Sequence, residues 1–214
     1  YYNSDKTRRY LLQLINRSEY ILLELPLSAP EEKYVFDEIV KSNMYGIYAV
    51  STTEDKEAIL LKRGFTGSCK ILLSKPKKFD LRNGLILASG TTIYDDKYGY
   101  VAFYPKSQDS GVFIYGPYTI LLPGTYKVTF LIKVTSFDIN KDRSIGLIDV
   151  ADNYGREILE SKEILSSDIQ VGKWQNYTLI IHINDIKKSV EFRVIVKPNI
   201  EMYFANVIVE RVIA

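Results

Sequence analysis

The chain has 214 residues, with 28 lysines and arginines against 26 aspartates and glutamates, and a formal net charge of +2. Hydrophobic residues make up 46% and charged residues 25%, a composition typical of a folded globular protein. Near-neutral charge argues against a dedicated nucleic-acid binder. A single Cys excludes a disulfide framework and a cysteine zinc site, and a single His excludes a histidine metal cluster. No run reaches the roughly 18–20 apolar residues of a membrane-spanning helix.

Residues 1–75 are predicted to form a small α/β region. Apolar residues at helical spacing predict a helix over Asp5–Arg17. Pro30-Glu31-Glu32 opens a second helix, which runs to about Lys41, because proline suits the first helical turn and carboxylates suit the positive end of the helix. Short apolar runs predict strands at Tyr20–Leu25, Tyr45–Val50, Ala58–Leu61 and Lys70–Leu73.

Residues 77–214 are predicted to form a jelly-roll-like β-sandwich, which makes the fold class mainly β. A charged connector over residues 77–82 leads into short apolar runs separated by turn signals, a pattern typical of an antiparallel sandwich. The number of long runs fits a jelly roll better than an immunoglobulin-like sandwich. The runs are Leu85–Ala88, Tyr100–Tyr104, Gly111–Ile114, Thr125–Val134, Ser144–Val150, Gln175–Ile183, Ser189–Val196 and Tyr203–Val212.

Tyrosines supply the first candidate site. Strand alternation predicts that Tyr98, Tyr100 and Tyr104 share one face, opposite Val101 and Phe103. Exposed aromatic rings can stack on the C–H face of a sugar ring, while nearby polar groups bind its hydroxyls. The alternative is that these rings pack on the sandwich, because tyrosine is a favoured strand residue. Further candidate stacking residues are Tyr94, Tyr115, Tyr154 and Trp174, the last with a core-capping role as its alternative.

Two pairs of aspartates and two glycosylation sequons complete the candidates. Asp95 with Asp96, and Asp149 with Asp152, could supply oxygen ligands to Ca²⁺, the one cofactor considered, or could be solvated turn residues. Asn16 and Asn176 each open an Asn-x-Ser/Thr sequon, which favours a location outside the cytoplasm. The start at Tyr1, without an initiator Met, is expected of a processed chain or a fragment.

Several segments, which together span residues 20–212, resemble a family of uncharacterised archaeal and bacterial multi-spanning membrane proteins. These segments are YILLEL (20–25), YGIYAV (45–50), AILLKRGFTG (58–67), YGPYTILLPGTYKVTF (115–130), DVA (149–151), Trp174 and VEFR (190–193). The resemblance is to the C-terminal extracytoplasmic region, and the membrane part of that family is itself similar to C-type glycosyltransferases. It implies a carbohydrate-binding-module-like jelly roll here, and places the catalytic carboxylates in membrane loops outside this chain. The loop 51–56 is longer than the resemblance leads us to expect.

Two functions are therefore expected, neither of them catalytic. The first is an extracytoplasmic binding or accessory domain for a glycan or a lipid-linked sugar, tethered to the membrane by a flanking region. The second is a structural cell-surface subunit, part of a filament, sheath or surface layer, that self-assembles and has no small-molecule ligand. Both place the chain at the cell surface, and neither involves nucleic acid. Glycoside hydrolysis needs two carboxylates across a cleft, and no pattern in the sequence marks such a pair.

Overall fold

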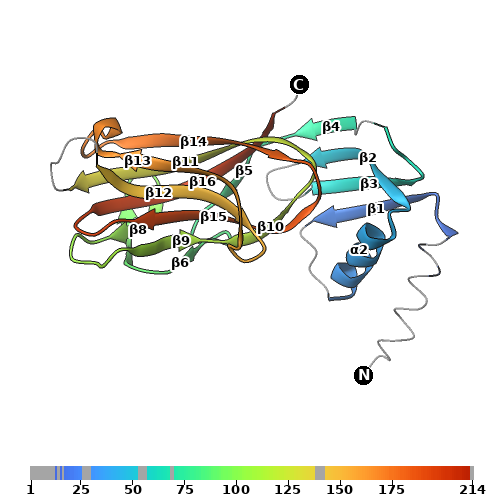
Figure 1. Cartoon of the computed structure of the whole chain (residues 1–214), viewed down its shortest axis with the longest axis horizontal. Coiled ribbons are helices and arrows are strands. Elements are labelled where there is room, and N and C mark those ends of the chain that lie inside the picture. The colour runs from blue at the N-terminus through green and yellow to red at the C-terminus, as the bar shows by residue number, and fades with distance from the viewer. Residues whose placement is uncertain are drawn as a thin grey trace. The chain divides into compact units, whose positions relative to one another are not determined.

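The computed structural model describes residues 13, 15, 17–25, 30–52, 57–67, 70–137 and 143–212, with only the backbone at 30–32, 57 and 70–73. The chain divides into two compact units, residues 1–75 and residues 76–214 (Figure 1). Most of the predicted helix Asp5–Arg17 and the lone Cys69 lie outside the described residues; positions 13, 15 and 17 are helical. No helix in the described part of the chain has the length and apolar character that a membrane crossing requires.

The first unit is a four-stranded sheet with a helix on it, in the strand order β1-β3-β2-β4. β3 pairs antiparallel with both β1 and β2, and β4 pairs parallel with β2. The strands and helix confirm the predicted elements of this region. Their bounds are β1 Tyr20–Leu25, α2 Pro30–Ser42, β2 Tyr45–Thr52, β3 Glu57–Arg63 and β4 Lys70–Ser74. Phe36 and Ile39 of α2 are buried together with Val50 and Ile59 of the sheet, which explains why the helix stays on this face.

Arg63 fastens the end of the N-terminal helical segment to this sheet. Its guanidinium donates to the carbonyls of Ser18 and Ile15, and the Tyr45 hydroxyl donates to the same two carbonyls. The guanidinium also lies over the Tyr45 ring, 5.2 Å from its centroid. A cation at the C-terminal end of a helix satisfies carbonyls that have no partner within the helix and opposes the helix dipole.

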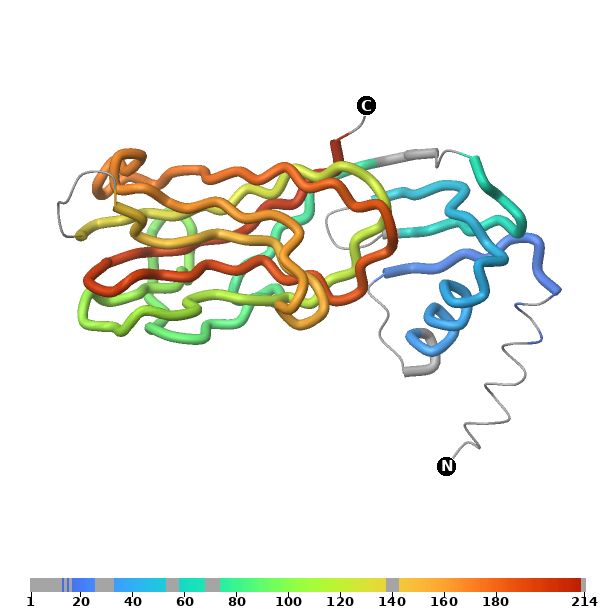
Figure 2. Tube along the Cα trace, in the orientation of Figure 1, coloured from blue at the N-terminus to red at the C-terminus, as the bar shows by residue number. Residues whose placement is uncertain are grey.

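The second unit is an antiparallel sandwich of two six-stranded sheets. The β11 sheet has the order β14-β11-β16-β8-β7, with β5 paired to β16; the β15 sheet has the order β13-β12-β15-β9-β6, with β10 paired to β15. The strands run back and forth along the length of the sandwich (Figure 2). The bounds are β5 Lys77–Phe79, β6 Ile86–Leu87, β7 Thr91–Asp95, β8 Gly99–Tyr104, β9 Gly111–Tyr115, β10 Pro117–Leu121, β11 Gly124–Ser136, β12 Ser144–Asp152, β13 Glu157–Leu165, β14 Trp174–Ile183, β15 Lys187–Val196 and β16 Glu201–Val212, with a 3₁₀ turn at Ser166–Asp168.

Alternating side chains of the long strands build the sandwich core. Val128, Phe130 and Ile132 of β11 are buried, as are Phe192 and Val194 of β15, so each strand turns every second residue inward. The fold is thus a jelly-roll-like antiparallel sandwich preceded by a small α/β unit, as the sequence predicts.

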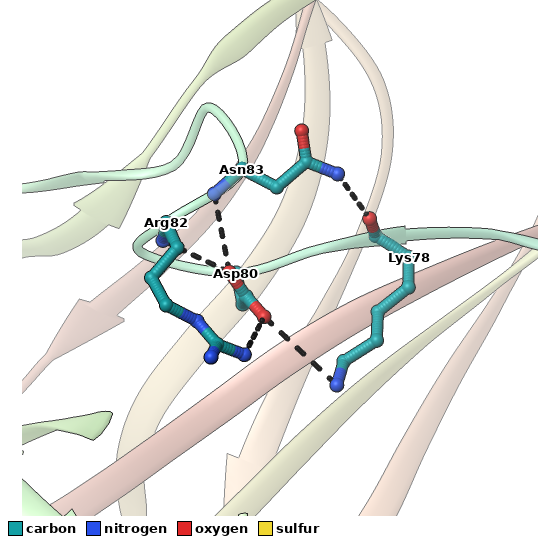
Figure 3. A network of polar contacts seen from close by, with 4 residues as sticks. All are labelled: Lys78, Asp80, Arg82 and Asn83. Carbon is teal, nitrogen blue, oxygen red and sulfur yellow. Dashed lines mark hydrogen bonds and ion pairs between the residues drawn. The ribbon is translucent and has the colours of Figure 1, made fainter. Parts of the chain in front are cut away.

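The predicted charged connector over residues 77–82 is wrong in its first half. Residues 77–79 form β5, which pairs with β16. The chain then turns at Asp80, whose Oδ1 accepts hydrogen bonds from the backbone N–H groups of Arg82 and Asn83 at 2.9 and 3.1 Å. Its Oδ2 lies 3.1 Å from Arg82 Nη2 and 3.9 Å from Lys78 Nζ, while Asn83 Nδ2 donates to the Lys78 carbonyl (Figure 3). The charged residues therefore hold a tight turn into the sandwich.

Candidate functional site

Tyr104 does not belong to an exposed stripe, and that prediction is wrong. The side chain is fully buried in the sandwich core, where its ring packs edge-on against Phe113 at a centroid distance of 5.1 Å, and its hydroxyl donates to the Asp109 carbonyl. Burial, followed by the Asp109 carboxylate, raises the pKa of Tyr104. Tyr100 and Tyr104 are separated by an even number of residues on β8, yet the Tyr104 ring contacts Phe113 of β9 whereas Tyr100 is 57% exposed. Alternation identifies a face without showing which part of it is covered.

Tyr94 and Tyr100 form an exposed pair on the β7–β8 hairpin. They are direct cross-strand partners and are 67% and 57% exposed. Their ring centroids lie 5.7 Å apart at an interplanar angle of 80°, so one ring meets the other edge-on. The two rings therefore do not form the coplanar platform that sugar stacking favours.

Tyr98 and Trp174 belong to a cluster around Lys133. The Lys133 ammonium lies 4.8 Å from the Trp174 ring centroid, 4.3 Å from that of Tyr203, and 3.7 Å from Asp95 Oδ2. Tyr98 meets Trp174 edge-on at 5.0 Å. These contacts join the β7–β8 turn to strands β11 and β14. The Lys133 ammonium is already surrounded by two aromatic rings and a carboxylate. The cluster therefore stabilises the contact between strands and does not form an open binding surface.

Asp95 links the Lys133 cluster to the backbone of the β7–β8 turn. Its Oδ1 accepts hydrogen bonds from the backbone N–H groups of Lys97 and Tyr98 at 3.0 and 3.1 Å. Burial acts to raise the pKa of Asp95, but these two hydrogen bonds and the Lys133 ammonium hold it below its usual value. Its neighbour Asp96 is exposed in the turn.

A second group of candidate tyrosines, Tyr115, Tyr118 and Tyr154, lies together on the β15 sheet. Tyr115 ends β9, Tyr118 lies in β10, and Tyr154 lies in the turn between β12 and β13 (Figure 1). The Tyr118 centroid is 6.2 Å from that of Tyr115 and 5.6 Å from that of Tyr154. Tyr154 is 73% exposed and Tyr118 36%. The turn that presents Tyr154 has positive φ at three successive residues, 53° at Asn153, 57° at Tyr154 and 75° at Gly155.

A rigid ion pair lies on the same sheet. Asp149 of β12 and Arg193 of β15 are cross-strand partners, and their neighbours Val150 and Phe192 turn into the core. Arg193 donates from Nε and Nη2 to the two oxygens of Asp149, both at 2.7 Å. This hydrogen bonding raises the pKa of Arg193. The bidentate geometry fixes the guanidinium plane and occupies both oxygens of Asp149, which is only 1% exposed.

In the part of the chain that the structure describes, Glu191 carries a buried oxygen without a hydrogen-bond partner, as does Ser189 on the same strand. It is 4% exposed, and its Oε1 is buried without any hydrogen-bond partner in the described residues. Burial, together with the Asp149 and Asp152 carboxylates, raises the pKa of Glu191, although Arg193 opposes this. The same carboxylate contributes, after burial, to the raised pKa of Tyr118, which follows Pro117, the cross-strand partner of Glu191. A buried carboxylate without a hydrogen bond is costly, and ligand binding is one way to remove that cost.

Gly155 lies over both charged groups. A Cβ added at this residue would lie 2.3 Å from Arg193 Nη1 and 3.7 Å from Glu191 Oε1. The turn that carries Tyr154 therefore rests on a donor and an acceptor at once. Asp152, at the start of this turn, accepts a 3.0 Å hydrogen bond from the Ser189 backbone N–H and is also buried.

The sequence predicted only part of this site. It singled out Tyr154, and it named Asp149 and Asp152, but as calcium ligands. Glu191 and Arg193 alternate with Val190, Phe192 and Val194, a pattern that by itself indicates only a side of the strand opposite the core. The pairing of opposite charges between Arg193 and Asp149 could have revealed them. To predict it, one must know the register between two strands whose paired residues are 44 positions apart in the sequence.

Neither pair of aspartates forms a calcium loop. Asp95 is engaged by Lys133 and Asp149 by Arg193. Across residues 13–212, within the described ranges, no group of three or more Asp, Glu, His or Cys side chains is arranged to hold a metal ion. Of the two sequons, Asn176 is exposed on β14, whereas Asn16 lies outside the described residues.

No protein-family model matches the sequence, and no curated protein does. Solved structures with a similar fold include the C-terminal CBM6 of LamC, a marine laminarinase from Zobellia galactanivorans, with a TM-score of 0.48 and 9% identity over 64% of this chain and 100% of that one. A xylan-binding module, CBM15, has a TM-score of 0.44 and 14% identity over 64% of this chain and 97% of that one. The Bacillus thuringiensis insecticidal crystal protein Cry7Ca1 has a TM-score of 0.43 and 9% identity, over 73% of this chain and 26% of that one.

Proposed function

We propose that this chain is a non-catalytic carbohydrate-binding domain whose site is formed by Tyr118 and Tyr154 above Glu191 and Arg193. The observation that carries the proposal is Glu191 Oε1, which is buried, without a hydrogen-bond partner among the described residues, beneath the turn that presents the exposed Tyr154 ring. A sugar hydroxyl both donates and accepts hydrogen bonds. It can therefore donate to Glu191 and accept from Arg193 Nη1, which Asp149 does not engage, once the turn at Gly155, which covers both groups in this structure, moves aside.

The tyrosines supply the apolar part of this recognition. Tyr154 offers a largely exposed ring, and its centroid lies 5.6 Å from that of Tyr118 at an interplanar angle of 44°. Two rings tilted in this way can contact one sugar along its C–H face while its hydroxyls reach the charged groups. Such combinations of aromatic surface with a few fixed polar groups are characteristic of small-ligand sites.

Geometry also supports a binding role without catalysis. A glycosidase needs one carboxyl group that gives up a proton and a second that acts on the opposite side of the bond. Two carboxylates lie near Glu191: Arg193 holds both oxygens of Asp149 at 2.7 Å, and Asp152 is buried and accepts a hydrogen bond from the Ser189 backbone N–H. Asp149 is therefore unsuited to act as a nucleophile or base.

Affinity measurements on two variants test where the site lies. Tyr154→Ala removes the exposed ring of the proposed site, and Tyr94→Ala removes a similarly exposed ring from the β7–β8 hairpin. In isothermal titration of the full chain with neutral oligosaccharides, we expect Tyr154→Ala to weaken binding about tenfold or more, consistent with the loss of one stacked ring. We expect Tyr94→Ala to bind as the parent does. The reverse pattern would place the site on the hairpin, as the sequence pattern suggested.

The cellular setting is a further part of the proposal. We place the domain outside the cytoplasm and tethered to a membrane in its parent protein, with a glycan or lipid-linked sugar as its ligand. The accessible sequon at Asn176 and the family resemblance of residues 20–212 support this setting. Attachment of an N-glycan at Asn176, detected by mass spectrometry of the protein from its native membrane or cell surface, is the expected result. An unmodified Asn176 in that sample would remove the support that the sequon gives.

The alternative is a self-assembling cell-surface subunit, favoured by the exposed apolar side chains of β1. Leu22 and Tyr20 are 71% and 44% exposed on an edge strand of the first unit. Edge strands with apolar side chains are prone to pair with other chains. Concentration-dependent growth in light scattering, abolished by Leu22→Lys and accompanied by no glycan binding, would favour this alternative over the binding domain.

A further inference from the structure

The proposed site has an unbalanced charge. Three carboxylates, those of Asp149, Asp152 and Glu191, share the region with one guanidinium, that of Arg193. Arg193 and Asp149 neutralise each other in a bidentate pair. The hydrogen bond that Asp152 accepts from the Ser189 backbone N–H brings no compensating charge. The ionised groups therefore sum to a net negative charge around the position that a ligand would take.

The surrounding cations do not restore the balance. Lys187, which begins β15, is paired with Glu157 at 2.6 Å. Arg156 follows Gly155 in the same turn but is exposed, so solvent and salt screen its charge. The pKa of Glu191 reports the sum of these effects: burial and the two aspartates raise it even though Arg193 lies close by.

Resting on the proposed function, we infer that the site selects uncharged or amino sugars and excludes sugars that carry a carboxylate or sulfate on the bound ring. An anionic substituent would have to lose its water next to Glu191, Asp149 and Asp152, while the positive charge of Arg193 is already balanced by Asp149. A protonated amino group, by contrast, donates up to three hydrogen bonds and meets an unpartnered acceptor in Glu191. The expected order of affinity is amino sugar, then neutral sugar, then uronate or sulfated sugar.

Matched pairs of ligands test this order on the full chain. One pair is methyl-esterified against free oligogalacturonides, which share a ring and differ in charge. A second is chitosan against chitin oligomers, which differ in a free or an acetylated amine. A panel of neutral gluco-, xylo- and manno-oligosaccharides provides the reference. We expect the ester to bind at least about tenfold more tightly than the free acid at low salt, and chitosan to bind more tightly than chitin.

A charge-neutral variant separates this inference from the proposed function. Glu191→Gln keeps the side-chain size and removes one negative charge, so it is expected to narrow the gap between ester and free acid and to weaken chitosan binding. Glu210→Gln removes the same charge from the β11 sheet and is expected to leave the order unchanged. If neutral sugars bind but free acids bind as tightly as their esters, the selectivity is overturned and the proposed function stands. If no sugar binds at all, both are overturned.

Discussion

At the scale of single residues, Glu191 is a buried carboxyl group whose ionisation lowers the stability of the folded protein. Its carboxyl group has a raised pKa because burial and two neighbouring aspartates disfavour its ionised form. A raised pKa in the folded state means that the folded protein binds the proton more tightly than the unfolded chain does. The cost of ionisation is then fully present above the folded-state pKa, and disappears as pH falls below the ordinary value of 4.5.

Glu191→Gln should therefore change the pH dependence of stability. Relative to the parent, the variant gains free energy of unfolding at pH 7, and this gain shrinks as pH is lowered through 4.5. Urea unfolding at a series of pH values measures the difference. A difference between the two proteins that stays constant from pH 7 to pH 3.5 would show that Glu191 is not destabilised by its surroundings.

Lys133 is the second residue with an informative position, since it lies among Trp174, Tyr203 and Asp95. Lys133→Met keeps the apolar stem but removes the cation, which leaves Asp95 without its ion pair. We expect a loss of about 1–2 kcal/mol in the free energy of unfolding. Trp174 is the single tryptophan, so its fluorescence reports on this cluster directly. Unchanged stability together with an unchanged emission spectrum would contradict the role of Lys133 in joining the β7–β8 turn to the sheet.

At the scale of elements, the turn after β5 depends on one carboxylate. The backbone N–H of Arg82 and its guanidinium, together with the Lys78 ammonium, lower the pKa of Asp80 against the opposing effect of burial. A lowered pKa contributes stability that is present above the ordinary value of 3.8 and lost as pH falls through the folded-state value. Asp80→Ala should cost about 1–3 kcal/mol at pH 7 and progressively less at acid pH, as measured by denaturant unfolding. An equal cost at pH 7 and pH 2.5 would show that the charge of Asp80 plays no part.

The β12–β13 turn requires a glycine at position 155. Gly155 has a φ of +75°, and an added Cβ would collide with Arg193 Nη1 at 2.3 Å. Gly172 has nearly the same φ, +76°, with nothing within 4 Å of an added Cβ, and so provides a matched control.

Both Gly→Ala variants should lose about 1 kcal/mol to backbone strain. Gly155→Ala should lose more, and it should also weaken glycan binding because Tyr154 and Arg193 must move. Thermal unfolding compares the two variants. Equal losses in both, with glycan binding intact in Gly155→Ala, would show that the turn does not rest on the charged groups.

Element by element, the sequence predicted strands that carry apolar runs, including the edge strands β1, β4, β6 and β14, but it missed the edge strands β7 and β13. β11 and β15 were predicted because apolar side chains alternate along them and one face is buried. β13, Glu157–Leu165, was not predicted, because it is an edge strand whose side chains are mostly exposed and therefore show no apolar alternation. β7 is an edge strand with the same character. Hydrophobic periodicity reports burial, and these two strands have little of it.

At the scale of the whole molecule, the proposed site belongs entirely to the sandwich. Its residues come from β10, β12, β15 and the β12–β13 turn, all within the unit 76–214, which has a hydrophobic core of its own. The sequence could indicate a sandwich rich in tyrosine, but not which tyrosines remain exposed. Tyr104 and Tyr154 look alike in sequence, yet one is fully buried and the other 73% exposed. The exposure of each tyrosine depends on how strands distant in the sequence pair and pack. The local sequence pattern carries no information about that pairing.

The most direct test of the central claim is an NMR titration of the full chain with neutral oligosaccharides, followed through its backbone amides. The proposed site predicts saturable shifts in residues 153–156, in Tyr118 and in residues 191–193, and none in the β7–β8 hairpin. Shifts confined to Tyr94 and Tyr100, or no shifts at millimolar sugar, would contradict the site proposed for this domain.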